Sequence, residues 1–413
     1  MRLVRLSMER YRGFESLRLE LPPRLAVIVG VNGAGKSSVL DCLAVLLSQV
    51  QGSIQSRLGH GRRFRESDIL NGAPYTRNTV TAEFGGYTAE WTVALVRRGM
   101  PPQATSSLAG LGEWVAAVQQ ANQAGHYRLP LAVYYPVNRA VLDIPRRIRE
   151  RHEFTPLSAY DDALTGAGNF RLFFEWLRDQ EDLEHERIVR NGAMFTPPDP
   201  QLAAVRQAIE RLVPGFSDLR VQRAPQRMMV NKNGVPLAID QLSDGEKCLI
   251  AVAGDLARRL ALANPGNPNP LSAPAVVLLD EIELHLHPGW QRVIIERLLS
   301  TFPTCQFILT THSPQVLSAV PSESVVMLRD FAPVRPAAPT EGRDSNAILA
   351  EVMDVPERPE RIQIALADIA RLIDEDRLGD ARAAIDRLAE TLSERDAEIV
   401  RLRSLVTFLE APA

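Results

Sequence analysis

The sequence predicts an α/β fold with a mixed central sheet, an antiparallel β subdomain, a helical insertion and a C-terminal helical appendage. Three observations predict it. Short apolar runs at Leu25–Val29, Ala275–Leu279 and Gln306–Thr310 are typical of buried parallel strands. Apolar and polar residues alternate along residues 3–21 and 80–96, as they do in antiparallel hairpins. From residue 361 onward, apolar residues recur at helical spacing.

Turn residues locate the two hairpins. The first turns at Arg12-Gly13, and the second joins strands 80–84 and 87–96 through Gly85-Gly86. Further strands are expected at 219–221 and 228–230. The periodicity predicts helices over residues 38–50, 170–190, 201–212, 244–263, 289–299, 361–374, 378–392 and 396–409.

Changes in composition suggest the domain boundaries. Loops rich in Pro, Ser and Gly interrupt the middle of the chain, and the proline-rich stretch 331–340 precedes a segment rich in Ala, Arg, Glu, Asp and Leu. We expect an N-terminal lobe at 1–98, a helical insertion or lid at 99–216, a C-terminal lobe at 217–330 and a helical domain at 341–413.

Composition limits the class of protein. Of 413 residues, 45% are hydrophobic and 23% are charged, which excludes a disordered or fibrous chain, and the net charge of -3 gives no overall attraction to nucleic acid. Cys42, Cys248 and Cys305 lie far apart, as reduced core thiols do. Arg and Glu interrupt the N-terminus, and no run reaches the roughly 20 apolar residues of a membrane span. We expect a soluble, cytoplasmic protein.

A complete phosphate-loop motif follows the first buried strand. Residues 30–37, Gly-Val-Asn-Gly-Ala-Gly-Lys-Ser, match G-x-x-x-x-G-K-[ST] between a strand and a helix. Backbone N–H groups and the helix N-terminus would cradle phosphates, Lys36 would bridge the β- and γ-phosphates, and Ser37 would bind Mg²⁺. The alternative is a glycine-rich turn without a ligand. The expected nucleotide-binding residues of this loop are Gly30, Asn32, Gly33, Gly35, Lys36, Ser37 and Ser38.

Two carboxylates end the second buried strand. Charge at the end of such a strand is costly unless it serves a cation or a reacting group. We therefore expect Asp280 to hold Mg²⁺ and Glu281 to polarise the attacking water. The alternative is a strand that simply leaves the core into solvent.

Histidines follow both of the later buried strands. Glu283, His285 and His287 alternate in a string that could hold zinc, although no fourth ligand is near, and the alternative is a structural loop. His312 comes directly after the strand 306–310, and strand order places it beside the acidic pair. A neutral imidazole there would contact the γ-phosphate.

The segment Leu242-Ser243-Asp244-Gly245-Glu246 precedes a predicted helix. The amides of Ser243 and Gly245 would lie at a positive helix end and form an anion site, together with Glu246. The same letters also form an ordinary capping box from Ser243 to Glu246. The residues alone do not decide between the anion site and the helix cap.

The order of these motifs resembles the ABC-type ATPases of the SMC/RecF class. It runs from Tyr11–Phe14 through the phosphate loop, Leu-Ser-Asp-Gly-Glu and Leu-Leu-Asp-Glu-x-Glu-x-His-Leu-His-Pro to Thr-Thr-His-Ser, and it covers about 1–98 and 217–330. The resemblance implies the ABC-ATPase head fold, ATP and Mg²⁺ as cofactors, and Mg²⁺-dependent ATP hydrolysis. It also implies a homodimer or higher homo-oligomer, in which Ser243 and Gly245 of one subunit cap the ATP of the other. The glutamine that this class carries in its Q-loop has no counterpart that the sequence identifies.

The length of the chain limits which branch of this ATPase class it can resemble. About 200 residues separate Lys36 from Ser243, too few for the coiled-coil arm of a true SMC protein, and no large acidic nuclease domain follows. Residues 342–346, 348–355 and 358–359 look like the tail of PtuA-type ATPases of Septu and retron anti-phage systems, which are encoded beside an HNH nuclease. This implies a switch that controls a separate nuclease, with the helical tail as a docking surface. The tail could equally serve only to stabilise the homo-oligomer.

Two basic clusters leave a second function open. Residues 57–65 and 139–151 are rich in Arg and could touch DNA phosphates, although such runs are more often solvated faces. The alternative function is a RecF-like DNA-binding ATPase in repair or recombination.

Overall fold

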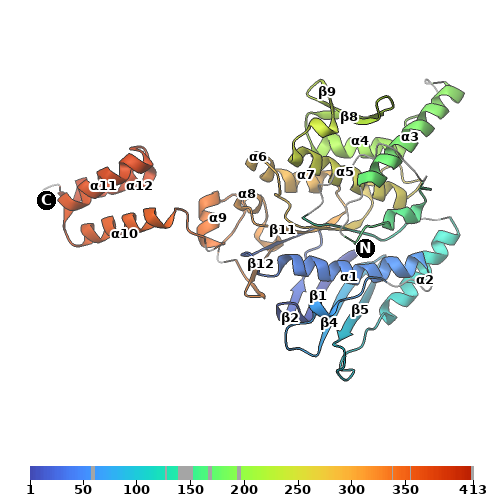
Figure 1. Ribbon diagram of the computed structural model, residues 1–413, viewed down its shortest axis with the longest axis horizontal. Coiled ribbons are helices and arrows are strands. Elements are labelled where there is room, and N and C mark those ends of the chain that lie inside the picture. Colours follow the sequence, from blue (N-terminus) through green and yellow to red (C-terminus); the bar gives the residue numbers. More distant parts are fainter. Residues whose placement is uncertain are drawn as a thin grey trace. The chain divides into compact units, whose positions relative to one another are not determined.

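The chain divides into two units, Met1–Ser345 and Asn346–Ala413. The computed structural model describes residues 1–56, 61–125, 128–137, 152–165, 170–192, 197–336, 338–353 and 355–410. Sheets and helices build the first unit, whereas the described part of the second unit is helical (Figure 1).

The central sheet of the first unit has the strand order β13-β12-β3-β11-β10-β6. Neighbouring strands in this sheet run parallel, except that β13 pairs antiparallel with β12. The four adjacent strands from β3 to β6 are wholly buried, which explains why their apolar runs are continuous rather than alternating. The bounds are β3 Leu25–Val29, β6 Leu131–Tyr135, β10 Ala275–Leu279, β11 Gln306–Thr311, β12 Val325–Arg329 and β13 Ala332–Val334.

The register brings the ends of three strands to one edge of this sheet. Val29 pairs with Thr311, and Leu279 pairs with Leu309. The chain segments that follow β3, β10 and β11 therefore emerge side by side at the carboxyl edge, where open parallel sheets bind their ligands.

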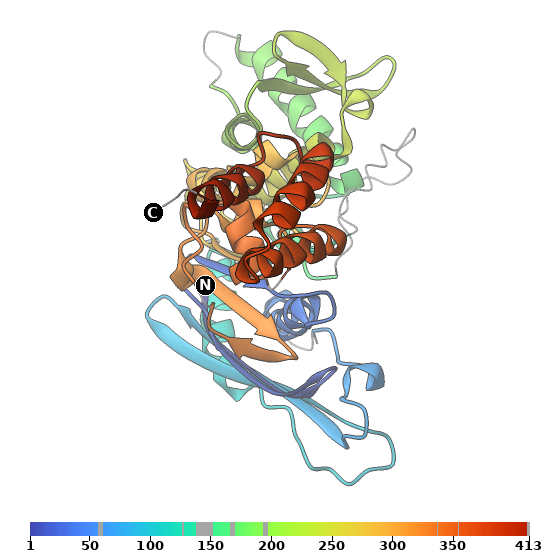
Figure 2. The ribbon, with the colours of Figure 1, turned by 90° about the vertical axis from the view of Figure 1, so that its left-hand side faces the viewer.

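A separate antiparallel sheet has the order β2-β1-β4-β5. Both predicted hairpins are confirmed, with turns at Arg12-Gly13 and Gly85-Gly86. Figure 2 shows this sheet and the small β7-β8-β9 sheet at opposite ends of the first unit. The bounds are β1 Arg2–Tyr11, β2 Phe14–Glu20, β4 Tyr75–Phe84 and β5 Tyr87–Val96.

Helix α1, Lys36–Gln55, joins the two larger sheets. It contacts β4 and β5 on one side and β6, β10 and β11 on the other (Figure 1). Length and composition would also let it cross a membrane, but 72% of the relevant stretch is buried inside the protein. The apolar character of α1 is therefore that of a core helix.

The described part of the segment 99–216 adds helices and strand β6 to the first unit. The patterns of the sequence did not predict strand β6, which forms the edge of the central sheet beside β10. The helices are α2 Ala109–Gln123, the 3₁₀ turn η2 Pro156–Tyr160, α3 Phe170–Asn191 and α4 Pro200–Leu212.

The third sheet precedes helix α5, Asp244–Ala263, whose bounds match the prediction. Helix α5 packs against α4, α3, η2 and β6. Predicted strands 219–221 and 228–230 lie within this sheet. Its strands are β7 Phe216–Gln222, β8 Arg227–Lys232 and β9 Val235–Ala238.

A buried ion cluster fixes α5 to the edge of the central sheet. Asp255 accepts hydrogen bonds from Arg258 and Arg259, both at 2.7 Å, and from the Tyr135 hydroxyl at 3.0 Å. Burial opposes ionisation, but the two guanidinium groups outweigh it and lower the pKa of Asp255 to about 2. Arg259 also donates to the carbonyl of Ala159 at 2.8 Å, so the cluster ties α5 to both β6 and η2.

The helix expected at 289–299 is wrong as a single element. The structure has two helices, α6 Pro288–Gln291 and α7 Ile294–Thr301. The amide of Val293 bonds the carbonyl of Trp290, three residues back, so the chain makes a turn there instead of continuing the helix. Apolar spacing alone does not distinguish these two arrangements.

The second unit is a small helical bundle after α9, Ser345–Glu351. The three predicted helices are confirmed within one residue at each end. A buried cluster that includes Ile369, Ile385 and Leu402 holds them together, and Arg358 bonds Asp396 at 3.0 Å. The helices are α10 Glu360–Asp374, α11 Leu378–Leu392 and α12 Ala397–Glu410.

Candidate nucleotide-binding site

The phosphate loop connects β3 to α1, as its motif predicts. Gly33 and Gly35 adopt φ values of 82° and 97°, which only glycine accepts readily. Helix α1 begins at Lys36, so its N-terminal amides and partial positive charge face the loop. The loop therefore forms a concave set of donors that suits a phosphate chain.

The side chain of Lys36 folds back across this loop. Its Nζ donates to the carbonyls of Gly30 at 3.0 Å and Val31 at 3.1 Å. Burial lowers the pKa of the Lys36 ammonium, and the nearby carboxylates of Glu281 and Asp280 partly offset this effect. The Lys36 ammonium thus lies close enough to the carboxylates of Asp280 and Glu281 to interact with them electrostatically.

Cross-strand hydrogen bonds hold the acidic pair at the end of β10. The hydroxyl of Thr310 donates to Asp280 Oδ1, and Thr310 Oγ1 accepts a hydrogen bond from the amide of Glu281 at 2.7 Å. The Asp280 amide donates to the carbonyl of Tyr135 on β6 at 2.9 Å. Glu281 is held at a φ of 46°, an uncommon backbone conformation for a non-glycine residue. Thr310 is a positioning residue that the motif did not reveal.

Glu283 positions the histidine that follows β11. Its carboxylate accepts the amide of His312 and, at 2.8 Å, the hydroxyl of Thr311. Burial lowers the pKa of His312, and the Lys36 charge lowers it further. The imidazole is therefore neutral near pH 7 and can donate to an anion from one ring nitrogen.

The zinc interpretation of Glu283, His285 and His287 competes with these structural roles. Glu283 already accepts two hydrogen bonds, and His287 Nδ1 accepts the amide of Gly289 at 3.2 Å to cap α6. Among the residues that the structure describes, no group of three His, Cys, Asp or Glu side chains is arranged for a metal. Glu283 and His287 thus have structural roles in this loop.

One pocket of about 420 Å³ gathers most of the predicted residues. Lys36, Glu281 and His312 line it together, although Lys36 and His312 are 276 positions apart in the sequence. The Ser37 hydroxyl in this pocket and the Asp280 carboxylate provide hard oxygen donors, which fit Mg²⁺. Lining residues are Arg12, Gly13, Asn32, Gly33, Gly35, Lys36, Ser37, Ser38, Glu281, His312 and Phe331.

The segment around Ser243 is absent from the described lining of this pocket. Ser243 is exposed at the start of α5, and its hydroxyl and amide bond Glu246 Oε2 at 3.0 and 3.1 Å. Lys232 pairs with the same carboxylate at 2.7 Å. The capping box is therefore formed, and Glu246 is engaged within its own chain.

Gly245 has a different reason to be glycine. A Cβ atom at this position would lie 2.4 Å from the carbonyl oxygen of His285, so no larger residue fits without movement of the backbone. The start of α5 therefore rests directly on the loop that follows the acidic pair.

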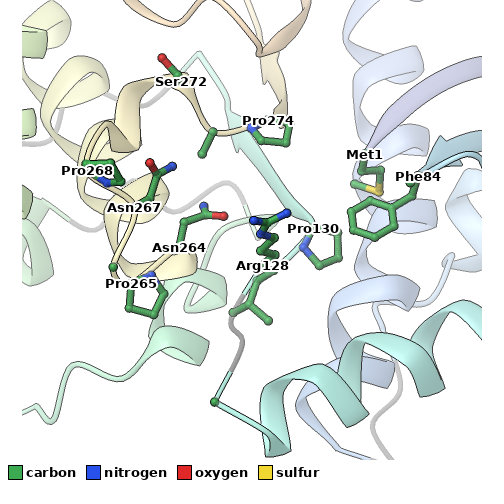
Figure 3. A pocket seen from close by; sticks show the side chains of 15 residues that line it. Met1, Phe84, Arg128, Pro130, Asn264, Pro265, Asn267, Pro268, Ser272 and Pro274 are labelled. Atoms are coloured by element: carbon green, nitrogen blue, oxygen red, sulfur yellow. The ribbon is translucent and has the colours of Figure 1, made fainter.

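A larger pocket of about 620 Å³ lies away from the phosphate loop (Figure 3). Met1 and Phe84 form one wall, the loop 264–274 forms another, and Arg128 lies between Asn264 and Pro130. Its described lining contains no carboxylate, thiol or imidazole. Size alone thus does not make it the reactive site.

The basic clusters are only partly within the described residues. Residues 57–60 and 139–151 lie outside them. Arg62, in the first cluster, donates its guanidinium to the carbonyl of Leu164 and its amide to Ser48 Oγ at 2.7 Å. Arg62 therefore helps hold its own loop in place.

Comparison with known families gives two overlapping matches. The family described as "AAA domain" matches residues 5–212, and "AAA domain, putative AbiEii toxin, Type IV TA system" matches residues 120–318. These matches together span the phosphate loop, the acidic pair and His312.

Similar proteins come from bacteria. The Retron Ec83 probable ATPase of Escherichia coli is 29% identical, with 87% of this chain and 77% of that protein covered. The Retron Vc95 probable ATPase of Vibrio cholerae is 28% identical over 87% of this chain and 80% of that protein. The Septu protein PtuA of Bacillus mycoides is 39% identical over 22% of this chain and 12% of that protein. Among solved structures, an SMC head bound to the C-winged helix domain of ScpA is 15% identical with a TM-score of 0.49, covering 81% of this chain and 97% of that chain.

Proposed function

The chain belongs to the AAA domain family and is an ATPase, and we propose that it is a switch in which two copies close head to tail around ATP. In this proposal each ATP lies between the phosphate loop of one copy and the Ser243 segment of the other. The observation that carries it is the separation of the two halves. Lys36, Glu281 and His312 line one pocket, whereas Ser243 lies exposed outside it.

Within one chain, the geometry suggests a division of labour. Lys36 and the loop amides bind the β- and γ-phosphates, and Ser37 and Asp280 would hold Mg²⁺, which neutralises phosphate charge. Glu281 accepts a proton from the attacking water, because its carboxylate lines the pocket beside Lys36. Neutral His312 donates a hydrogen bond to the γ-phosphate. Thr310 and Glu283 keep Glu281 and His312 in place.

The second copy supplies the cap. The exposed N-terminus of α5 offers the amides near Gly245 and the hydroxyl of Ser243 as anion donors. Ser243 must exchange its hydrogen bond with Glu246 for one with the γ-phosphate of the partner's ATP. Loss of the γ-phosphate on hydrolysis removes this bridge and lets the pair reopen.

We further propose that the switch serves anti-phage defence by controlling a separately encoded effector nuclease of the HNH type in the cytoplasm. The similarity to two retron ATPases over 87% of the chain supports this proposal, as does the shorter match to Septu PtuA. No second catalytic constellation is present among the described residues, so we expect the closing pair to act through a bound partner. The exposed apolar side chains of the helical unit, including Phe408 and Val400, are candidates for docking.

Mixing two inactive variants tests the shared site. Lys36→Ala removes the phosphate-binding lysine, and Ser243→Arg blocks the cap, so each variant alone should be inactive. A mixed pair contains one intact composite site, and we therefore expect partial recovery of ATP hydrolysis. The matched control mixes Lys36→Ala with the double variant Lys36→Ala/Ser243→Arg, which leaves no intact site. Equal rates in both mixtures would contradict the head-to-tail arrangement.

A DNA-repair role predicts a different result. A RecF-like ATPase should bind DNA by itself with strong salt dependence, and DNA should stimulate its hydrolysis. The defence proposal instead predicts co-purification with the product of a neighbouring nuclease gene and no stimulation by DNA alone.

A further inference from the structure

The nucleotide pocket continues beyond the groups that face the phosphates. Arg12, Gly13 and Phe331 line the part next to Ser38, the last residue of the phosphate loop region. Arg12 Nη1 lies 3.3 Å from Ser38 Oγ, which connects the two segments. A bound nucleoside triphosphate must place its base and sugar somewhere along this pocket, and none of the phosphate-binding roles uses Phe331.

The ring of Phe331 lies over two glycines of this region. A Cβ atom on Gly13 would be 2.1 Å from the ring, and one on Gly35 would be 3.1 Å from it. The ring therefore occupies the space that a side chain at position 13 would fill. Phe14 contacts it edge to face, with ring centroids 5.2 Å apart and an interplanar angle of 84°, which fixes its orientation.

The backbone of Phe331 is unfavourable for a phenylalanine. Asp330 and Phe331 form the two-residue turn between β12 and β13, with φ values of 49° and 59°. Turns with both central residues at positive φ favour Asn-Gly or Asp-Gly, because a bulky side chain is strained there. A strained residue at the edge of a ligand pocket is grounds for a functional hypothesis.

At this end of the pocket, the side chain of Arg12 is poorly suited to recognise a base through hydrogen bonds. The guanidinium of Arg12 is already shared between Asp41, at 2.7 Å, and Asp68, at 3.0 Å. Phe331 offers an aromatic face in this lining, and an aromatic face recognises a base by stacking, which depends on ring area more than on hydrogen-bonding edges.

We propose that Phe331 is the platform on which the purine base of the bound nucleotide stacks. It thereby sets a preference for purine over pyrimidine nucleoside triphosphates, because a purine offers more stacking area. The proposal deepens the proposed ATPase function and rests on it. It assigns to the β12–β13 turn a binding role that the catalytic groups do not provide.

The test separates the base from the phosphates. Calorimetry would measure the Kd of ATP and of inorganic tripolyphosphate, which lacks the base, for the full-length wild-type protein and for Phe331→Gly. Glycine suits the positive φ, so this variant should fold. We expect the Kd of ATP to rise about 10-fold, in line with loss of one base–aromatic stack, and that of tripolyphosphate to stay the same. Phe331→Trp should restore ATP affinity, and Tyr87→Gly, which removes an exposed aromatic side chain next to another hairpin turn, should change neither constant.

Three results would overturn the proposal. Equal weakening of ATP and tripolyphosphate would mean that Phe331 only supports the phosphate loop. Unchanged affinity for ATP would mean that the base binds elsewhere, and would leave the ATPase function intact. A wild-type protein that binds tripolyphosphate with the same affinity as ATP would show that the base has no site.

Discussion

The two halves of the proposed nucleotide site differ in how the chain holds them. Residues at the carboxyl edge of the central sheet are partly or fully buried, and bonds between neighbouring strands fix them, as Thr310 fixes Asp280 and Glu281. The segment that begins α5 is exposed at Ser243, and its hydrogen bonds run within one helical turn. The first half is therefore prearranged before any ligand binds. The second half has formed its helix cap but lies outside the described lining of the phosphate-loop pocket of its own chain.

The largest expected effect concerns the chemistry of the prearranged half. Glu281→Gln keeps the size of the side chain but removes the proton acceptor, so ATP hydrolysis should fall by about 10²–10⁴-fold. ATP should then stay bound and the closed pair should accumulate, as measured by size-exclusion chromatography and nucleotide retention. The control Glu15→Gln alters an exposed carboxylate on β2. A Glu281→Gln protein that hydrolyses ATP at the rate of this control would contradict the role of Glu281.

The second prediction compares how much one hydrogen-bonding side chain in each half contributes to the free energy of unfolding. Thr310→Val leaves buried partners of the hydroxyl unsatisfied, so we expect the free energy of unfolding to fall by about 1–3 kcal/mol. Ser243→Ala removes an exposed helix cap and should cost about 1 kcal/mol. Chemical denaturation of the protein without nucleotide measures both, with the exposed Thr304→Val as control. If Ser243→Ala cost more than Thr310→Val, the contrast between the two halves would be wrong.

The smallest effect is the pH dependence that His312 contributes. Its pKa is lowered in the folded protein, so between that value and about 6.5 the unfolded chain binds more protons than the folded one. Stability should therefore rise with pH through this window and be lost as the solution becomes more acidic. Denaturation of His312→Gln at pH 5.5 and 7.5 should show a smaller difference than the wild type. An unchanged difference would assign the dependence to other groups.

The local sequence predicts individual helices and strands better than the hydrogen bonds between them. The phosphate loop could be found because eight consecutive residues carry it, and the apolar runs of β3 and β10 indicate burial directly. Thr310 and Glu283 could not be assigned, because their roles depend on pairing β11 with β10 across 28 to 30 positions. Strand β6 lies among loops and helices whose patterns conceal it.

Phe331 was hidden for a related reason. The sequence placed it in a proline-rich linker, and nothing near it in the chain indicates that its ring lies over Gly13 and Gly35. Apolar spacing does not reveal the division between α6 and α7 either, because it lies in the backbone hydrogen bonds around Val293. Long-range packing and single backbone bonds leave no periodic signal in the residues.

The contact between Gly245 and the carbonyl of His285 leaves no clearance, since even a methyl group would be 2.4 Å from that oxygen. The same short loop carries Glu283, which holds His312. A shift of this loop would therefore displace both His312 and the N-terminal end of α5. In the proposed pair, such a mechanical linkage would make the two sites interdependent, so that turnover at one site alters occupancy at the other.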